Sequence, residues 1–384
     1  MSSNAPTVVD AAADRAPEAK RRAAARGSNF NGATHGLRGL ASLAVFIAHL
    51  LGGTAEHIYA DRPGYVSLVF APWSFGAWGV DLFFAISGFV ILPSIRRYSL
   101  GEFALRRLLR LYPLFFSLSV VFIALNALTN EYPHLNNVKT IISGLFFVNL
   151  LTHTEQLTPN AWSLTYEVMF YTLSALLYQY VFRKWDSILA TAAVILSCLF
   201  IWRYPIALFF VGGAFVRLLC DQKIRPSQKV GRIAEVVFAL GCVGLAGSSR
   251  IGFSQQEMLN PVAWLLIAST IGYFYCAVQE ASITTLISKN KIIIYLGTVS
   301  YSLYLVHPYT YYLTRTAFVS LGLFTEEIFL SMTLFFCVTI PLTIALTHVA
   351  HDWLEVRAYQ WFFNQRIYRR AKKSGPAHSD YQSE

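Results

Sequence analysis

Charged residues are scarce in this sequence. Asp, Glu, Lys and Arg together make up 14% of its 384 residues, whereas an average soluble chain carries about a quarter. Hydrophobic residues account for 55% of the chain, and the mean hydropathy is +0.46. This balance excludes a disordered chain and an ordinary cytosolic enzyme. Because a membrane-spanning helix needs about 20 apolar residues, the chain has room for roughly ten spans, and we expect an all-α, polytopic membrane protein.

Cysteine is also rare, and its positions follow no disulfide or metal-binding pattern. The five cysteines lie in or beside apolar segments, without a CxxC spacing. They are therefore interpreted as small apolar helix residues, which argues against a disulfide scaffold and a zinc site. We expect no cleavable signal peptide either, because the first 36 residues are rich in Ala, Arg and Ser and have no apolar core. The cysteines are Cys198, Cys220, Cys242, Cys276 and Cys337.

The chain does carry an excess of positive charge, with 31 Lys and Arg against 21 Asp and Glu. A net charge of +10 could suggest a nucleic-acid partner. The basic residues, however, are grouped between apolar stretches, as in membrane proteins that retain Lys and Arg on the cytoplasmic side. The excess therefore indicates membrane orientation, and we expect no nucleic-acid partner. The basic groups lie at 15–26, 96–110, 217–232 and 366–373.

Eleven apolar segments set the expected topology. All basic loops fall on the cytoplasmic side if segment 138–151 enters the membrane without crossing it, since an apolar stretch this short is more often re-entrant or buried. We therefore expect about ten transmembrane helices plus one short re-entrant segment, with both termini cytoplasmic. The expected domains are a disordered basic tail (1–33), a membrane domain (34–355) and a basic C-terminal tail (356–384). The segments are 37–54, 75–94, 111–130, 138–151, 162–182, 186–202, 204–220, 233–249, 260–279, 293–316 and 327–352.

Two ionisable residues lie in the first apolar segment. Arg38 and His49 are eleven residues apart, which places them on one helix face about 16 Å apart along the axis. An ionisable residue inside a span is costly and indicates function by default. The alternative is an arginine that extends to the interface and a histidine hydrogen-bonded between helices. The expected topology places Arg38 at the cytoplasmic entrance and His49 in the outer half.

The second segment contains Asp81, in the stretch FGAWGVDLFFAISGF. Its carboxylate could orient or charge His49, as acids do for catalytic histidines. A helix-cap or helix-pairing role explains it equally well. Gly76, Gly79 and Gly88 in the same segment predict close approach of neighbouring helices.

The stretch FALRRLLRLYP follows on the inner side. Arg107 and Arg110 share a helix face at i,i+3, and Arg106 and Arg110 do so at i,i+4. Three arginines beside the Arg38 entrance could bind phosphate, because the guanidinium fork matches phosphate oxygens. The alternative is a set of positively charged anchors at the membrane surface.

The stretch NAWSLTYEVMFY opens the fifth segment from the outer side. Asn160 can cap the helix start, and Trp162 is placed at the membrane interface. Ser163, Glu167 and Tyr171 recur at i,i+4 on one helix face. A carboxylate within this apolar run is not explained by packing, so Glu167 is interpreted as functional.

The tenth segment contains YLGTVSYSLYLVHPYTYY. Ser300, Tyr304, His307 and Tyr311 share a face at spacings of 4, 3 and 4. Pro308 cannot donate to the carbonyl of residue 304, which predicts a kink beside His307. A buried structural His–Tyr pair is the alternative.

A further pair of histidines, in HVAH at 348–351, resembles a metal motif. The pair lies near a cytoplasmic helix end, where such histidines are more often interfacial, and no third ligand converges on it. We therefore expect no metal site.

The polar residues of the spans sort by depth. Arg38, Arg107 and Arg110 are expected at the cytoplasmic end, whereas His49, Asp81, Glu167 and His307 are expected toward the outside. This arrangement suits an anionic donor held from inside and proton chemistry on a second substrate further out. Histidine is the usual general base near neutral pH.

Five motifs together closely resemble the acyltransferase 3 family of integral membrane acyltransferases. They are Arg38 with ten residues before His49, GVDLFFAISGF (79–89), RRLLRLYP (106–113), WSLTYE (162–167) and YLGTVSYSLYLVHP (295–308). The resemblance covers residues 34–355. It implies transfer of an acyl group, most often acetyl from acetyl-CoA, to hydroxyls of cell-surface or lipid-linked carbohydrates at the bacterial inner membrane.

The resemblance also implies roles for particular residues. The family's Arg-x10-His pair corresponds to Arg38 and His49, its RxxR motif to Arg107 and Arg110, and its WSLxxE acid to Glu167. Together with the spacing arguments, this gives His49, Glu167 and Asp81 as candidate catalytic residues. Arg38, Arg107 and Arg110 are the candidate acyl-CoA ligands, and Trp162, Ser163, Tyr304 and His307 the candidate substrate-binding residues.

A secondary transporter or glycan exporter is the alternative from another functional class. In that case the same charges would line a substrate path. Transporters usually show repeated halves and paired broken helices, and neither is evident in this sequence. The identity of the acceptor, the acyl group and the oligomeric state are left open by the sequence, with membrane lipid and a carbohydrate acceptor as the expected partners.

Overall fold

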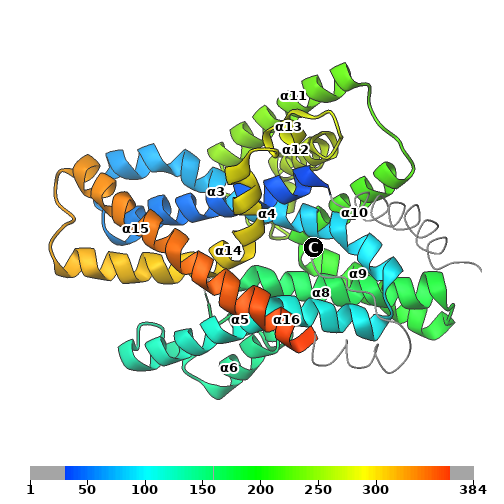
Figure 1. The fold of residues 1–384 in the computed structure, drawn as a ribbon, viewed down its shortest axis with the longest axis horizontal. Coiled ribbons are helices and arrows are strands. Elements are labelled where there is room, and N and C mark those ends of the chain that lie inside the picture. The colour runs from blue at the N-terminus through cyan, green and yellow to red at the C-terminus, as the bar shows by residue number, and fades with distance from the viewer. Residues whose placement is uncertain (1–30, 159, 364–384) are drawn as a thin grey trace, which may run out of the picture.

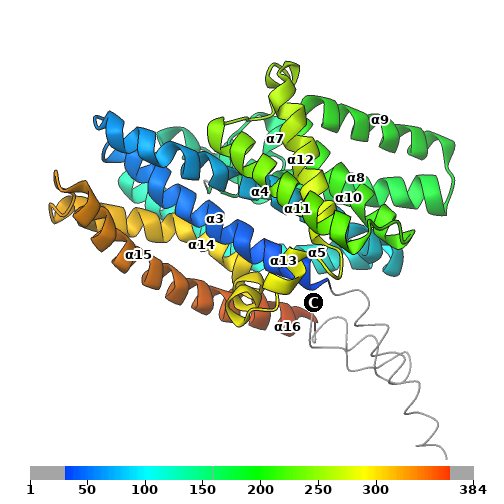
Figure 2. The ribbon, with the colours of Figure 1, turned by 90° about the horizontal axis from the view of Figure 1, so that it is seen from above.

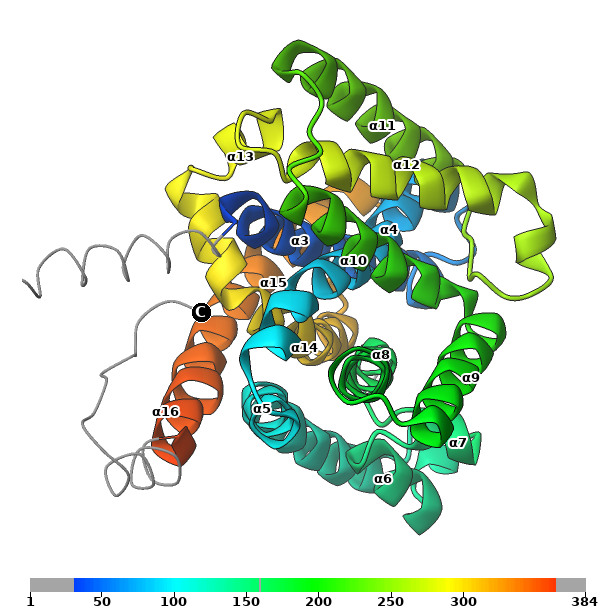
Figure 3. The same ribbon diagram turned by 90° about the vertical axis from the view of Figure 1, so that its right-hand side faces the viewer.

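The computed structural model describes residues 31–158 and 160–363, and these residues contain helices and no strand. Figure 1 shows several of the long helices running lengthwise across the view, and Figure 3 views some of these close to end-on. The expected N-terminal tail lies almost wholly outside the described residues, as does 364–384. The all-α prediction is confirmed for the described part of the chain.

Three long helices form the first part of the fold. They are α3 (Gly32–His57), α4 (Pro63–Arg97) and α5 (Leu100–Thr129). Each begins where the sequence provides a start signal. The side chain of Asn31 accepts hydrogen bonds from the backbone at the start of α3, Pro63 occupies the first turn of α4, and Ser99 caps α5.

The short apolar segment at 138–151 forms no spanning helix. It folds as α6 (Val138–Leu145) and α7 (Asn149–Thr152), and Phe147 between them has a positive φ of 56°. A helix of eight residues is about 12 Å long, far less than the roughly 30 Å of a bilayer core. The prediction that this segment does not cross the membrane agrees with these lengths.

Each of the ten longer apolar segments corresponds to a helical region. The remaining helices are α8 (Trp162–Leu177, continued by the π-helix η2, Tyr178–Arg183), α9 (Ser187–Arg203), α10 (Leu208–Asp221), α11 (Gln228–Ser248), α12 (Pro261–Ala277), α13 (Ile283–Ile287), α14 (Lys291–Ser320), α15 (Ile328–Ala350, continued by the π-helix η5, His351–Arg357) and α16 (Ala358–Phe363). Three short 3-10 helices complete the fold: η1 (Pro133–Leu135), η3 (Pro205–Ala207) and η4 (Glu257–Leu259).

Within residues 31–158 and 160–363, five helical stretches are long and apolar enough to cross a membrane, and the total is six if the α9–α10 pair, bent by 114°, counts as one span. The five are α3, α4, α5, α11 and the stretch Ile328–Trp361. The protein is thus a multi-pass membrane protein. The ten-span count and the cytoplasmic position of both termini stay predictions. Helical structure also continues past the expected domain boundary at 355, through Phe363.

Helix α3 is the centre of the packing, with α4 on one side and α14 on the other (Figures 1 and 2). Glycines make these contacts close. A Cβ atom on Gly39 would lie 2.5 Å from the backbone nitrogen of Gly297, and one on Gly79 would lie 2.8 Å from the carbonyl oxygen of Ala41. Gly88 of α4 likewise lies against the backbone of α10. The predicted close approach at the α4 glycines is confirmed.

Candidate active site

His49 lies on the central helix α3, and its hydrogen bonds define which ring nitrogen is free. Nδ1 is 2.8 Å from the carbonyl oxygen of Val45. A carbonyl only accepts, so Nδ1 carries the hydrogen and Nε2 carries the lone pair. The side chain of His49 is exposed, although its neighbours Ala48 and Leu50 are buried. Among the described residues, Nε2 of His49 therefore has no hydrogen-bond partner, and this nitrogen can take up a proton.

His307 of α14 is the nearest aromatic partner of His49, with ring centroids 5.0 Å apart. Its Nδ1 donates to the carbonyl oxygen of Leu303 at 2.9 Å, and its Nε2 accepts from Nδ2 of Asn160 at 3.0 Å. Both ring nitrogens are thus occupied, and the residue is fully buried. The two histidines differ for this reason: His49 is available for proton transfer, and His307 is held in place.

Asn160 serves a different purpose from the one expected. The N-cap position of α8 is Ala161, which makes no side-chain cap, so the prediction that Asn160 caps its own helix is wrong. Its Nδ2 instead donates across to the carbonyl oxygen of Tyr304 at 3.0 Å. That carbonyl would ordinarily bond the N–H of residue 308, which is Pro308 and has none. Asn160 thus supplies the donor that the proline removes, and α14 continues without interruption through Pro308.

Tyr304 and Ser163 lie next to His307 and Asn160 in the site. The hydroxyl groups of the two residues are 2.9 Å apart, and the Tyr304 hydroxyl is 3.1 Å from the carbonyl oxygen of Asn160. Both side chains are buried. The structure therefore brings together Ser163, Tyr304 and His307, three of the four expected substrate-binding residues, in one hydrogen-bonded group around Asn160. The fourth, Trp162, is exposed, and its ring lies edge-on to Phe84.

Glu167 lies on α8, one turn after Ser163 in the sequence. It accepts a hydrogen bond from Ser87 at 2.8 Å and another from the hydroxyl of Tyr171. Arg38 interacts electrostatically with Glu167 and Tyr171. The structure thus groups Glu167 with the arginines, whereas the sequence placed it with His49 toward the outside.

The arginines of α5 face in different directions. Arg106 donates two hydrogen bonds to Glu102, at 3.0 and 2.8 Å, and is thereby neutralised on its own helix. Arg107 lies 5.1 Å from the ring centre of Tyr171, and Arg110 interacts electrostatically with Arg38. The structure therefore brings Arg38, Arg107 and Arg110 to the same end of α8, which is the set expected to bind the donor.

Glu355 is a charged residue of this region that the sequence analysis missed. It lies in the π-helix η5, where it accepts from Ser302 at 2.8 Å and pairs with His351 at 2.9 Å. Its carboxylate is mostly buried and interacts electrostatically with Arg38. The sequence held one signal, a carboxylate four residues after a histidine at the end of an apolar helix. Nothing local shows that the π-helical turn directs this side chain toward α14 and Arg38.

Asp81 is not brought to His49. Gly76 and Gly79 form the face of α4 that meets α3, and Asp81 lies roughly 140° around the helix from Gly76. Its carboxylate is buried and interacts electrostatically with Cys242 of α11. The structure therefore supports a helix-pairing position for Asp81 more than contact with the histidine.

The described residues contain no group of three or more His, Cys, Asp and Glu side chains placed to hold a metal ion. In the HVAH motif, His348 lies 6.4 Å from the ring of Tyr295, and His351 is the partner of Glu355.

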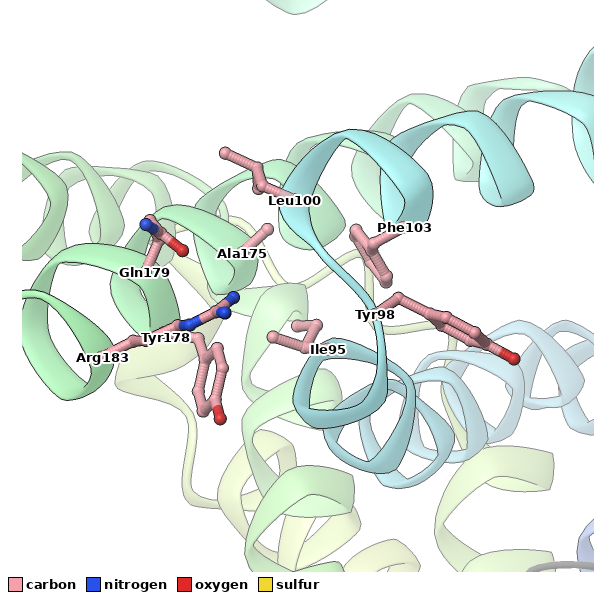
Figure 4. Close-up of a pocket in the computed structure, with 8 residues that line it drawn as sticks. All are labelled: Ile95, Tyr98, Leu100, Phe103, Ala175, Tyr178, Gln179 and Arg183. Carbon is pink, nitrogen blue, oxygen red and sulfur yellow. The ribbon is translucent and has the colours of Figure 1, made fainter. Parts of the chain in front are cut away.

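A small cleft opens at the arginine end of the site, between the α4–α5 turn and the end of α8 (Figure 4). Its volume is about 10 Å³, enough for water but not for a cofactor. Tyr98 and Phe103 line it. The guanidinium carbon of Arg106 lies 4.2 Å from the ring centre of Tyr98, and that of Arg107 lies 5.8 Å from the ring centre of Phe103. The cleft thus borders the positively charged part of the site.

Comparison with known proteins identifies the family. A family profile described as an acyltransferase domain, that of the acyltransferase 3 family, matches residues 31–348. The chain is 26% identical over 271 residues to the exopolysaccharide production protein ExoZ of Rhizobium meliloti (strain 1021). The aligned region covers 65% of this chain and 81% of ExoZ. No solved structure matches the chain significantly. The chain therefore belongs to the acyltransferase 3 family, and it is a membrane acyltransferase.

Proposed function

We propose that this protein is an O-acetyltransferase that moves an acetyl group from cytoplasmic acetyl-CoA to a hydroxyl of a cell-surface or lipid-linked glycan. The glycan is suggested by the relative, whose name associates it with exopolysaccharide production. Family membership favours the enzyme over a transporter. In this proposal the arginine end of α3 faces the cytoplasm, both termini lie there, and the protein resides in the bacterial inner membrane.

The observation that carries the proposal is the free Nε2 of His49 on the helix that also bears Arg38. The hydrogen bond from Nδ1 to Val45 leaves that nitrogen as a base. The eleven-residue spacing places the base about 16 Å from the guanidinium-bearing turn. A single rigid helix therefore sets the distance between the donor's anionic end and the reacting thioester.

The donor site consists of Arg107, Arg110 and Arg38. Two guanidinium groups close together repel each other unless an anion lies between them, and phosphate is the anion that matches their geometry. Glu167 and Glu355 partly neutralise Arg38, so we assign phosphate binding chiefly to Arg107 and Arg110. Glu167 then acts as a positioning residue for Arg38.

The transfer step needs one base and no metal. His49 Nε2 accepts the proton of the acceptor hydroxyl while its oxygen forms a bond to the thioester carbonyl carbon. The carbon–sulfur bond breaks, and the coenzyme A thiolate leaves and takes up the proton from the imidazolium. An acyl-imidazole on His49 is the second route. Nε2 first displaces the coenzyme A thiolate from the thioester carbonyl carbon, and the hydroxyl oxygen then displaces the imidazole from that carbon and passes its proton to the thiolate.

In this mechanism, one hydrogen-bonded group forms the side of the site next to His49; it contains His307, Ser163 and Tyr304. Ser163 and Tyr304 bond each other, and both are connected to His307 through Asn160, which favours positioning of His49 and of the acceptor. Asp81 is assigned to the packing of α4 against α11, so its removal leaves the base intact.

The test is transfer of label from radiolabelled acetyl-CoA to membrane glycans. The His49→Ala protein should insert normally and lose transfer, whereas His57→Ala, at the exposed end of the same helix, should retain it. Full activity of the His49→Ala protein would exclude the proposed mechanism. Arg110→Ala should raise the KM for acetyl-CoA, and an unchanged KM would exclude Arg110 from the donor site.

A further inference from the structure

A second pocket lies at the opposite end of α3, beside the connection between α11 and α12. Its volume is about 220 Å³, and its lining combines the polar residues Ser249, Arg250, Glu257 and Asn260 with the apolar residues Ile251 and Val262. Small-molecule sites usually measure about 300–1,000 Å³. The pocket is therefore close to the size of one small ring and too small for a long chain.

Arg250 is held in this pocket by an aromatic ring. Its guanidinium carbon lies 3.4 Å from the ring centre of Trp73 on α4, which fixes the plane of the group. The nearest carboxylate, Glu56 at the end of α3, is 3.9 Å away, too far for a hydrogen bond. Among the residues described, Arg250 makes no hydrogen bond to a side chain or carbonyl, so its N–H groups are free for a ligand.

Two other polar side chains of the pocket already accept hydrogen bonds from the backbone. Glu257 accepts from the backbone N–H groups of Gly252 and Ser254, at 2.9 and 2.8 Å. The side chain of Asn260 accepts from the backbone of Val262 at 3.0 Å. In the described part of the chain, the side chains of Arg250 and Glu56 make no hydrogen bond, and they lie together on the side of the pocket toward α3.

This pair is connected to His49 through α3. Glu56 follows His49 by seven residues, so the two lie on one face about 10 Å apart along the helix. Both Arg250 and Glu56 interact electrostatically with His49. Trp73 packs against Gly52, which lies between them on α3 and whose lack of a side chain makes room for the indole. The pocket therefore lies on the outward approach to the base.

We propose that this pocket binds one neutral sugar unit of the acceptor, with its hydroxyls bridging Arg250 and Glu56; the inference rests on the proposed function. A sugar hydroxyl both accepts and donates, so it can accept from the guanidinium while it donates to the carboxylate. An acidic sugar would instead meet two carboxylates, Glu56 and Glu257. The sugar held here directs a hydroxyl of the same or the adjoining unit inward to His49.

The experiment measures acetyl transfer from radiolabelled acetyl-CoA to methyl β-glucoside and methyl β-galactoside, with methyl glucuronoside as the acidic comparison, on the full-length protein in detergent. Arg250→Ala should raise the KM for the neutral glycosides about tenfold or more, the loss expected for a hydrogen bond to a charged group. The KM for acetyl-CoA should stay within about twofold. Glu56→Gln should have an intermediate effect, since an amide can still accept.

The matched control is Arg203→Ala. Arg203 also lies over an aromatic ring, that of Tyr204, at 4.9 Å, but it does not line the pocket, so its removal should leave every KM unchanged. Ligand-observed NMR provides a second measurement, in which the wild type should bind the neutral glycosides and Arg250→Ala should not.

Two results would overturn the pocket assignment. One is an unchanged KM for the glycosides in the Arg250→Ala protein, and the other is neither transfer to nor binding of either neutral glycoside by the wild type. Failure of the proposed function is distinguishable, because it appears as full acetyl transfer by His49→Ala regardless of the pocket.

Discussion

Asn160 donates a hydrogen bond to the carbonyl oxygen of Tyr304, which Pro308 leaves without its usual helical donor. We therefore expect substitutions of Asn160 and Pro308, which are far apart in the sequence, to affect stability jointly. Replacing Asn160 with Ala removes the donors to the carbonyl oxygen of Tyr304 and to Nε2 of His307, both at 3.0 Å and both buried. A buried acceptor left unsatisfied costs about 1–3 kcal/mol. The substitution should therefore lower the free energy of unfolding by about 2–6 kcal/mol in total.

Replacing Pro308 with Ala should recover part of this loss. The new backbone N–H can donate to the Tyr304 carbonyl within the helix, and only the His307 nitrogen then lacks a partner. The penalty of Asn160→Ala should consequently be smaller by about 1–3 kcal/mol in the Pro308→Ala background. Because a double-mutant cycle compares the same change in two backgrounds, it removes the intrinsic effect of the proline on the helix.

The assay is equilibrium unfolding of the four proteins in mixed micelles, together with acetyl transfer by each. Asn260→Ala is the control: Asn260 caps α12 locally, so its penalty should be about 1 kcal/mol and should not depend on residue 308. Equal penalties for Asn160→Ala with and without Pro308 would refute the shared carbonyl. Transfer should fall in Asn160→Ala and stay low in the double variant, because His307 is still unrestrained.

Three further predictions concern packing, charge and pH. Gly213→Ala should prevent stable folding, because its new methyl group would overlap the backbone carbonyl of Ala85; the measurement is the monodisperse fraction after detergent extraction. Glu355→Gln should lower kcat/KM for acetyl-CoA about tenfold, because Arg38 loses a buried countercharge. Glu355→Asp keeps the negative charge, so its kcat/KM should lie between those of the wild type and Glu355→Gln. Burial alone would raise the pKa of Glu257, but hydrogen bonds from Gly252 and Ser254 outweigh it and hold the pKa below the ordinary 4.5. Its stabilising effect is therefore present above pH 4.5 and is lost as the pH falls through the lower folded-state pKa, so hydrogen exchange in residues 249–260 should increase in acid.

Each of these three predictions has a control variant. Gly244→Ala adds a methyl group with no atom within 4 Å, so it should not reduce the monodisperse fraction. Glu326→Gln removes a carboxylate that is exposed and paired with Arg62, and it should leave kcat/KM unchanged. Glu257→Gln should abolish the acid dependence of hydrogen exchange. A normal fold in Gly213→Ala, full activity in Glu355→Gln, or acid-independent exchange in the wild type would contradict the respective argument.

The helices could be predicted from the sequence because apolar length is a local property. The placement of the basic loops and the short length of the segment at 138–151 separate it from the spans, and α6 and α7 are as short as the length argument requires. Same-face arguments were also sound within one helix, as for Ser163 and Glu167 on α8. The number of membrane crossings is a different matter, because it depends on a bilayer that neither sequence nor fold contains.

Contacts between helices could not be predicted in the same way, since helical periodicity does not give the rotation of one helix relative to another. Asp81 and His49 each lie on a well-defined face, but the faces do not meet. Asn160 is a residue type that often caps helices, but the position of α14 gives its amide a different partner, the carbonyl oxygen of Tyr304. Glu355 was missed because a π-helical turn changes the direction of the side chains that follow it.

The hydrogen bond between His49 and Val45 has an implication for how acceptor preference could change in this family. Since the carbonyl that orients the imidazole belongs to the same helix, one turn away, the direction of the base does not depend on any loop. The α11–α12 connection could then be exchanged between relatives, or diversified in a library, without disturbing the reaction step. New substrate preferences would arise through changes at the periphery, while a single helix preserves the chemistry.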